Sequence, residues 1–220
     1  MRGAHVVLVL GLVGGLGAPA AWAVGRPADA AGPAVAEVLA AAPPGAPAPR
    51  APADWVPEVT LRSAMAPPVP EVPAPARLVV PSIGVDAPVD PVGVSGTGAM
   101  RIPADVDRVG WYEHGPAPGD GAGSVVLAGH VDSRTQGLGA MAALRTAEVG
   151  AEVRVLDEAG TVSRWRVVAR ETLHKQQLPT AELFTRSGPR RLVLLTCGGP
   201  FDEELRSYRD NVVVLAEPVP

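Results

Sequence analysis

The sequence predicts a mainly β domain, a closed barrel of about eight strands with one or two short helices, behind a disordered leader. From residue 77 onward, short runs of β-branched and apolar residues alternate with Gly, Pro and Asp, as in strands joined by turns. Of the 25 prolines, fourteen fall in residues 1–76, so the N-terminal third differs from the rest. A closed barrel is favoured because it leaves no exposed sheet edge.

Residues 1–24 are predicted to be an apolar membrane anchor or signal segment. After Arg2, no charged side chain occurs before Arg26, and about 20 apolar residues suffice to cross a bilayer. Ala21-Trp22-Ala23 is also typical of a signal-peptidase cleavage site. We therefore expect a cell-membrane protein with an extracytoplasmic domain, or a secreted protein if the leader is cleaved.

Residues 25–76 are dominated by alanine and proline and are predicted to form an extended linker. Proline lacks a backbone donor and fixes φ, so this segment is a poor builder of sheet or helix. Its composition also offers too little apolar surface to offset the entropy of ordering. A linker of this kind would hold the following domain away from a membrane.

Residues 77–220 are predicted to be the folded domain, since their turn-separated apolar runs can bury a core. Residues 157–160 are predicted to form a hairpin turn, and short helices are expected at 138–146 and 180–185. The predicted strands are 78–80, 92–94, 109–112, 124–128, 152–156, 161–172, 191–196 and 211–216.

Charge and cysteine content exclude several classes of function. The net charge is −4 and no basic block occurs, which argues against a nucleic-acid partner. The only cysteine, Cys197, excludes an internal disulfide and any multi-cysteine metal site. The spacing of His130 and Asp132 fits metal ligation, but no second close histidine pair accompanies it, so no metal and no cofactor are predicted.

Three reactive side chains are predicted to lie beside strand ends. Cys197 follows an apolar run, His130 closes another, and Arg209 stands at the entry to the last strand. A cysteine nucleophile needs a proton-transfer partner and a donor for the oxyanion, which histidine and arginine supply. Each residue also has a structural interpretation, a packed thiol or an ordinary polar side chain, and Arg206 competes with Arg209.

The sequence around the cysteine resembles the sortases, cysteine transpeptidases of bacterial surfaces. The family motif is Thr-Leu-x-Thr-Cys; Leu194, Thr196 and Cys197 match it, and Val193 replaces its first threonine. The resemblance extends over residues 77–216 and includes the Gly-His pair that ends at His130. It is strongest to the class F sortases of actinobacteria.

This resemblance implies a catalytic role for each of the three residues. Cys197 would attack the threonyl carbonyl of a Leu-Pro-x-Thr-Gly-like sorting signal to give a thioacyl intermediate, and His130 would exchange protons with the amines. Arg209 would stabilise the oxyanion, while Thr196 and Asp132 would support the site. The partners implied are secreted proteins with a C-terminal sorting signal, and an amine acceptor from a cell-wall precursor or another surface protein.

Two alternatives remain open from the sequence. One is a non-catalytic β-module displayed on a proline-rich stalk; the other is a hydrolytic cysteine peptidase that uses the same residues with water as acceptor. For the enzyme, residues 171–183 lie between two predicted strands, and the resemblance to sortases implies that this connection forms a wall of the substrate groove.

Overall fold

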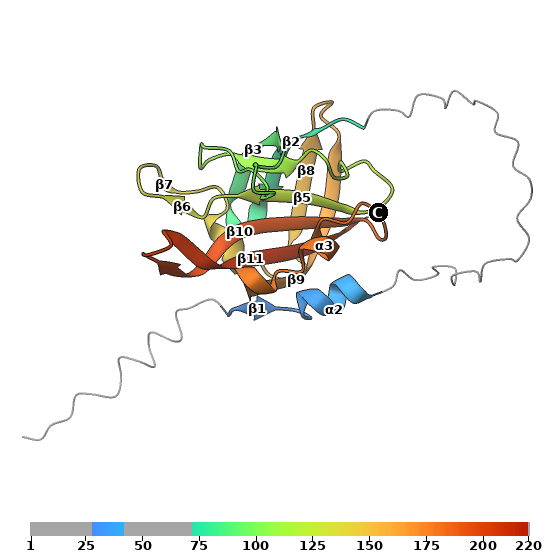
Figure 1. Ribbon diagram of the computed structural model, residues 1–220. Helices are drawn as coiled ribbons and strands as arrows, with labels where there is room; N and C mark the ends of the chain where they lie inside the picture. The colour runs from blue at the N-terminus through green and yellow to red at the C-terminus, as the bar shows by residue number, and fades with distance from the viewer. Residues whose placement is uncertain (1–27, 42–71, 220) are drawn as a thin grey trace, which may run out of the picture.

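Eight strands close into a barrel in the computed structural model, which describes residues 28–41 and 72–219 (Figure 1). They follow the order β9-β11-β10-β5-β4-β3-β2-β8, and pairing of β8 with β9 closes the ring. The predicted barrel is therefore confirmed. The barrel strands are β2 (Pro75–Val80), β3 (Val85–Val92), β4 (Val109–Tyr112), β5 (Ser124–Gly129), β8 (Glu152–Asp157), β9 (Val162–His174), β10 (Arg191–Asp202) and β11 (Ser207–Pro218).

The remaining elements are short and lie in the connections. A two-stranded hairpin, β6 with β7, follows β5, and both predicted helices are present, the first as a 3-10 helix. These elements are β6 (Asp132–Ser133), β7 (Gly137–Leu138), α3 (Thr180–Leu183) and the 3-10 helices η1 (Pro81–Ile83), η2 (Ala142–Thr146) and η3 (Lys175–Gln177).

Alternation along the strands divides the apolar residues between the barrel interior and its outer face. The interior cluster draws on all eight barrel strands and includes Trp111 and Trp165. On β10, Leu194 belongs to this interior cluster, whereas Val193 and Leu195 belong to a second cluster on the outer face. Odd-numbered residues in this part of β10 are therefore directed outward.

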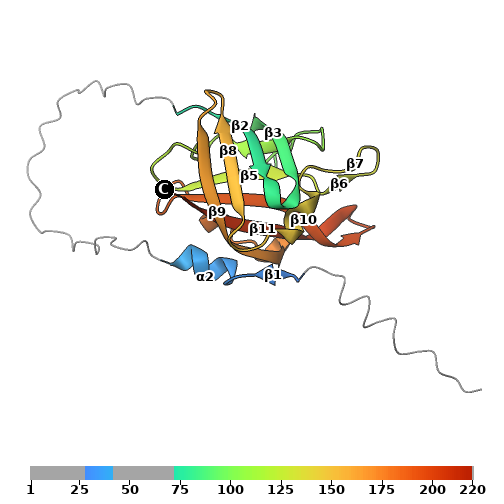
Figure 2. The same ribbon diagram turned by 180° about the vertical axis from the view of Figure 1, so that it is seen from behind.

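The outer cluster is covered by a segment from far earlier in the chain. Ala30–Ala31 form β1, which pairs with β9, and Val35–Ala40 form α2, which packs beneath the barrel (Figure 2). Val35 is fully buried there, and its backbone N–H donates to the Glu171 carboxylate at 2.8 Å. The buried Arg191 guanidinium donates at 2.7 Å to the carbonyl of Val38 near the other end of α2.

This docking corrects part of the sequence-based expectation. Residues 30–40 lie within the predicted extended linker, yet they form a strand and a helix against the barrel because Val35 and Val38 enter the outer cluster. The predicted leader (1–24) and residues 42–71 lie outside the described residues. Among the residues that are described, no helix has the length and apolar character needed to span a membrane.

Candidate active site

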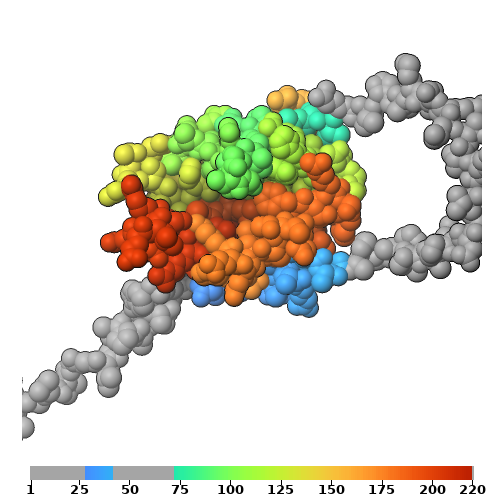
Figure 3. All heavy atoms as spheres, viewed as in Figure 1, coloured from blue at the N-terminus to red at the C-terminus, as the bar shows by residue number. Residues whose placement is uncertain are grey.

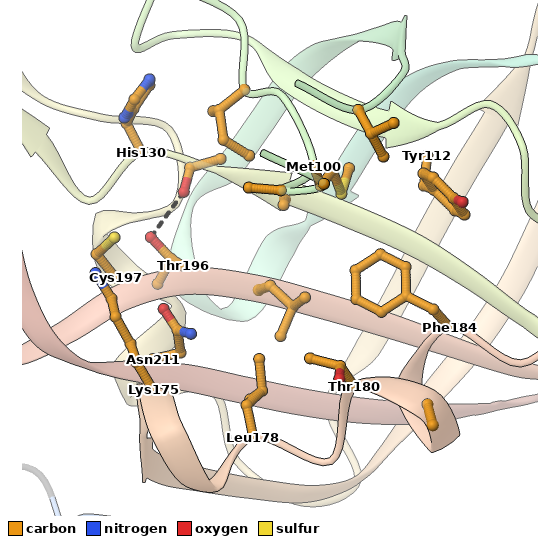
Figure 4. Close-up of a pocket in the computed structure, with 18 residues that line it drawn as sticks. Met100, Tyr112, His130, Lys175, Leu178, Thr180, Phe184, Thr196, Cys197 and Asn211 are labelled. Atoms are coloured by element: carbon orange, nitrogen blue, oxygen red, sulfur yellow. Dashed lines mark hydrogen bonds between the residues drawn. The ribbon is translucent and has the colours of Figure 1, made fainter. Parts of the chain in front are cut away.

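Cys197 and His130 are brought together by the parallel pairing of β10 with β5. The last paired residues of this register are Leu195 and Ala128, both in the outer-face cluster. Cys197 and His130 each lie two residues further along, so alternation directs both side chains to that same outer face. Both residues line the same two surface hollows, and Figure 4 shows them at the same end of the first one.

Thr196 ties the two strands together immediately before the reactive residues. Its hydroxyl donates to the Gly129 carbonyl at 2.9 Å, and the bond is buried. A buried hydrogen bond of this kind resists sliding of one strand past the other, because breaking it leaves a carbonyl without a partner. Thr196 therefore holds the spacing between Cys197 and His130.

The orientation of the His130 ring is set by a backbone carbonyl. Its Nε2 lies 3.0 Å from the carbonyl oxygen of Pro103, which can only accept a hydrogen bond. The neutral ring must therefore carry its proton on Nε2, and Nδ1 is the nitrogen left to exchange protons. The ring is half-buried, so it is held in place while one edge stays accessible.

The thiol of Cys197 is half-buried and unpaired, which suits a nucleophile better than a packed core residue. The strand does not end at residue 196, as predicted: β10 continues through Cys197 to Asp202, with an irregular register between Gly198 and Phe201. Gly199 has φ of +70°, and a Cβ there would overlap the Asp210 carboxylate. This bend starts the hairpin that projects beyond the thiol.

The structure does not place Arg209 against the thiol. Asn211 lies opposite Cys197 across the β10–β11 pairing, so alternation directs Arg209 to the same face. Its guanidinium instead pairs with Asp202, Nη2 to Oδ2 at 3.1 Å, and its side chain is 58% exposed. It lines neither of the two hollows, whereas the competing Arg206 lines one of them.

The Asp202 carboxylate is stabilised in its ionised form by the groups that donate hydrogen bonds to it. Its pKa is lowered first by a hydrogen bond from the Leu205 backbone N–H, and further by the Arg209 guanidinium. Both interactions stabilise the ionised form, so Asp202 stays charged and keeps Arg209 on the hairpin at neutral pH.

Asp132 contacts a tyrosine where the sequence suggested support for the histidine. The Tyr208 hydroxyl donates to Asp132 Oδ2 at 2.6 Å, and among the described residues no hydrogen bond joins Asp132 to His130. The hydrogen bond to Asp132 is the main cause that raises the pKa of Tyr208 to about 12. Tyr208 is a member of the site that sequence reasoning missed, because nothing in the sequence pairs it with Asp132.

The first hollow, here called the donor groove, has a volume of about 700 Å³ and a largely apolar lining. One wall comes from the loop around Met100 and Ile102, and the other from the β9–β10 connection (Figure 3). Tyr112 and Phe184 meet edge to face at its far end, with ring centroids 5.2 Å apart. The groove starts at Cys197 and His130, and its volume and apolar lining are typical of a ligand-binding cleft.

The two walls of the donor groove differ in how well the sequence predicted them. Lys175, Leu178, Thr180 and Ala181 line it, which agrees with the expectation that residues 171–183 form a wall. The opposite wall, residues 94–102, was not predicted, because its Gly-rich composition indicates only a turn.

The second hollow, here called the polar hollow, has a volume of about 760 Å³ and meets the donor groove at Cys197 and His130. Its other lining residues come from the β6–β7 hairpin and the β10–β11 hairpin, which project side by side (Figure 1). These residues supply two carboxylates, two guanidinium groups and three hydroxyls. The full set is Val131, Asp132, Ser133, Arg134, Phe201, Glu203, Arg206, Ser207 and Tyr208.

No metal site emerges from the part of the chain that the structure describes. There, no three His, Cys, Asp or Glu side chains lie close enough together to hold a metal ion. His114 packs edge-on against the Tyr112 ring, and His174 accepts a hydrogen bond from the Gln176 backbone. The two hollows that meet at the cysteine are thus the candidate site of the chain.

Comparison with known proteins points to one family. A family model described as the sortase domain matches residues 78–219. No curated protein matches the chain. Among solved structures, the chain is similar to sortase C-1 from Actinomyces oris, with 23% identity, a TM-score of 0.51, and coverage of 66% of this chain and 71% of that one.

Two further structures support the same fold. Group B Streptococcus pilus island 1 sortase C2 is 24% identical with a TM-score of 0.50, covering 66% of this chain and 73% of that chain. Sortase A from Corynebacterium diphtheriae is 18% identical with a TM-score of 0.51, covering 68% of this chain and 62% of that chain. At these identities the likeness establishes the fold.

Proposed function

The chain belongs to the sortase family of cysteine transpeptidases, and from that premise we propose that it cleaves a Leu-Pro-x-Thr-Gly-like sorting signal and transfers the acyl part to an amine. The observation that carries the proposal is the shared position of Cys197 and His130 at the end of an apolar groove. An extended peptide lying in that groove presents its scissile carbonyl to the thiol. The specific assignment to class F rests on the resemblance of residues alone.

In the acylation step, the Cys197 thiolate attacks the carbonyl carbon of the peptide bond, and a carbon–sulfur bond forms. The carbon–nitrogen bond then breaks, and the departing amine takes a proton from the His130 imidazolium. The products are a thioester on Cys197, a free amine and a neutral histidine. Nδ1 is the nitrogen that transfers this proton, because Nε2–H is held by the Pro103 carbonyl.

In the second step, a free amine attacks the thioester carbon. A carbon–nitrogen bond forms, the carbon–sulfur bond breaks, and the neutral His130 accepts the proton that the amine loses. The thiolate and imidazolium are restored, so the cycle needs no other reactant. The apolar lining of the donor groove disfavours water near the thioester, which favours transfer over hydrolysis.

Arg209 is the proposed donor to the oxyanion that forms in both steps. The side chain is 58% exposed and lies on the same strand face as Cys197, so it can rotate away from Asp202 when a peptide binds. Its planar group of N–H donors suits a negatively charged oxygen. Loss of one such donor reduces turnover by about 10²–10³ in comparable enzymes.

The biological setting is proposed from the family and from the sequence. The domain would act outside the cytoplasm, attached to the cell membrane through residues 1–24 or secreted after their removal. Its donors would be secreted proteins with a C-terminal sorting signal, and its acceptors amines on a cell-wall precursor or a surface protein.

The proposal is tested by incubating the full chain with a sorting-signal peptide, with and without an amine, and by following products by mass spectrometry. Wild type should give a covalent adduct on Cys197 and an amine-dependent product, Cys197→Ala should give neither, and Arg209→Gln should be slower by about 10²–10³. A bell-shaped pH profile is expected for acylation. Hydrolysis unaffected by amine would indicate a peptidase, and no cleavage at all would indicate a displayed β-module.

A further inference from the structure

The donor groove contains one charged side chain in an otherwise largely apolar lining. Among the described residues that line the groove, Lys175 is the only Lys, Arg, Asp or Glu. It follows β9 directly, as the first residue of η3, and is half-buried. It is also the only lysine among the 19 Lys and Arg residues of the chain. The mechanism described above gives this ammonium group no role.

Strand register places Lys175 at the end of the groove that holds the thiol. Leu173 of β9 lies opposite Asn211 of β11, and Asn211 lies opposite Cys197 of β10. Lys175 follows two residues after Leu173. Figure 4 shows Lys175 at the same end as Cys197, whereas the aromatic pair that closes the groove lies at the other end.

A hydrogen bond fixes the position of the ammonium group. Lys175 Nζ donates to the Ser207 hydroxyl at 2.7 Å, and the bond is partly buried. Ser207 lines the polar hollow, so the bond joins the walls of the two hollows that meet at Cys197. An ammonium group has three donors, and among the described residues Nζ makes no other hydrogen bond and no ion pair. Two donors and one positive charge therefore remain for a ligand.

The surroundings of Lys175 make an anionic ligand group favourable. A peptide that covers the groove removes water from the half-buried ammonium, and a charge that loses water without gaining a partner raises the free energy of the complex. A carboxylate on the peptide supplies that partner and makes charge-assisted hydrogen bonds. An amide supplies a weaker acceptor, and a second cation is repelled.

The position of the carboxylate in the peptide follows from the position of the scissile bond. The attacked carbonyl must lie at Cys197, and the acyl part runs from there along the donor groove. Each residue of an extended peptide spans about 3.3 Å, so the residue before the scissile threonine still lies over the thiol end. We propose that Lys175 selects donors with Asp or Glu at position x of the Leu-Pro-x-Thr-Gly-like signal. This inference rests on the proposed function and narrows its substrate class.

The first test compares peptides that differ only at position x. N-acetylated peptides with Leu-Pro-Glu-Thr-Gly and Leu-Pro-Gln-Thr-Gly are cleaved by the wild-type full chain with the same amine acceptor. The glutamate peptide should have a kcat/KM about five- to tenfold higher, and 1 M salt should reduce this preference. Equal kcat/KM values, or a preference for glutamine, would overturn the inference.

The second test uses variants of the lysine with a matched control. Lys175→Met keeps much of the apolar stem and removes the charge, so the ratio of the two kcat/KM values should fall to about one, while Lys175→Arg should keep the preference. Arg166→Gln, which removes an exposed charge of β9 that lines neither hollow, should keep the wild-type ratio. If the bond to Ser207 only held the groove wall in place, Lys175→Met would lower both values alike and leave the ratio unchanged. That result would overturn the inference.

A binding measurement separates this inference from the proposed function. In the Cys197→Ala full chain, the α-amine and Lys175 are the amines that acetic anhydride can modify, so mass spectrometry follows Lys175 without interference from another lysine. The glutamate peptide should slow acetylation of Lys175 at least about threefold more than the glutamine peptide at the same concentration. This outcome would support the carboxylate contact even if neither peptide were cleaved by wild type. Equal protection by both peptides, or protection by neither, would overturn the inference.

Discussion

Replacement of Thr196 with valine is expected to damage the site without removing a reactive group. Valine has nearly the same shape as threonine but no hydroxyl, so the change removes the 2.9 Å hydrogen bond to the Gly129 carbonyl. This bond is buried and joins β10 to β5 one residue before Cys197 and His130. The thiol and the imidazole should therefore lose their fixed spacing.

The magnitude follows from the burial of the bond. A net hydrogen bond contributes about 0.5–1.5 kcal/mol, and a buried acceptor left without a partner costs about 1–3 kcal/mol. The free energy of unfolding should fall by about 1–3 kcal/mol, or about 3–10 °C in the unfolding midpoint for a domain of this size. Misplacement of reacting groups by a fraction of an ångström should lower kcat/KM by about 10- to 100-fold.

The control is Thr196→Ser, which keeps the hydroxyl and loses one methyl group. It should lose about 1 kcal/mol of stability through packing and retain most of the peptide-cleavage activity. Denaturant unfolding and steady-state cleavage of a sorting-signal peptide measure the two effects. If the valine variant were as stable and as active as wild type, or if serine lost as much activity as valine, the positioning role of this bond would be refuted.

Three further predictions concern the charged groups around the site. In a Tyr112→Phe chain, Tyr208 is the only tyrosine left, and its phenolate absorbance should titrate near pH 12. Adding Asp132→Asn removes the hydrogen bond that raises the pKa, so the titration midpoint should move down toward 10. An unchanged midpoint would contradict the assigned cause. Because the pKa of Asp202 is lowered on folding, wild type should be more stable than Asp202→Asn at neutral pH, and this stability difference should shrink as the pH falls below about 4. Thermal unfolding measured across this pH range checks the prediction. A stability difference that does not change with pH would refute it. Arg191→Met should lower the free energy of unfolding by about 1.5–3 kcal/mol, since the buried guanidinium binds the carbonyls at the end of α2. The amides of α2 should then exchange hydrogen faster. Unchanged protection of these amides would argue against the proposed role of Arg191.

The barrel was predictable because its signals are local. Strands such as β5 and β10 are continuous apolar runs bounded by turn residues, and the turn at 157–160 closes β8 onto β9 as its sequence indicates. The resemblance to a family, carried by a handful of residues around Cys197, is confirmed by the match over residues 78–219. Both inferences rest on residues that are adjacent in the sequence, and such local patterns can be recognised without knowing the fold.

The docking of α2 was not predictable, because its signal is not local. The helix has only six residues, too few to be stable by themselves, and the groups that hold it, Glu171 and Arg191, lie more than 130 residues away in the chain. Only the folded barrel brings those side chains to the two ends of the helix. The helix then buries Val35 and Val38 against a surface that does not exist in the unfolded chain.

By itself, then, the sequence determined a β-barrel and singled out one cysteine and one histidine as candidate reactive residues, since alternation, turns and short motifs involve residues that are adjacent in the chain. The tertiary structure decided what depends on side chains meeting across strands: Arg209 pairs with Asp202, and Asp132 contacts Tyr208. It also decided that the thiol opens to two hollows, one apolar and one charged. Such contacts depend on strand register and hairpin bend, which arise only when the whole barrel closes.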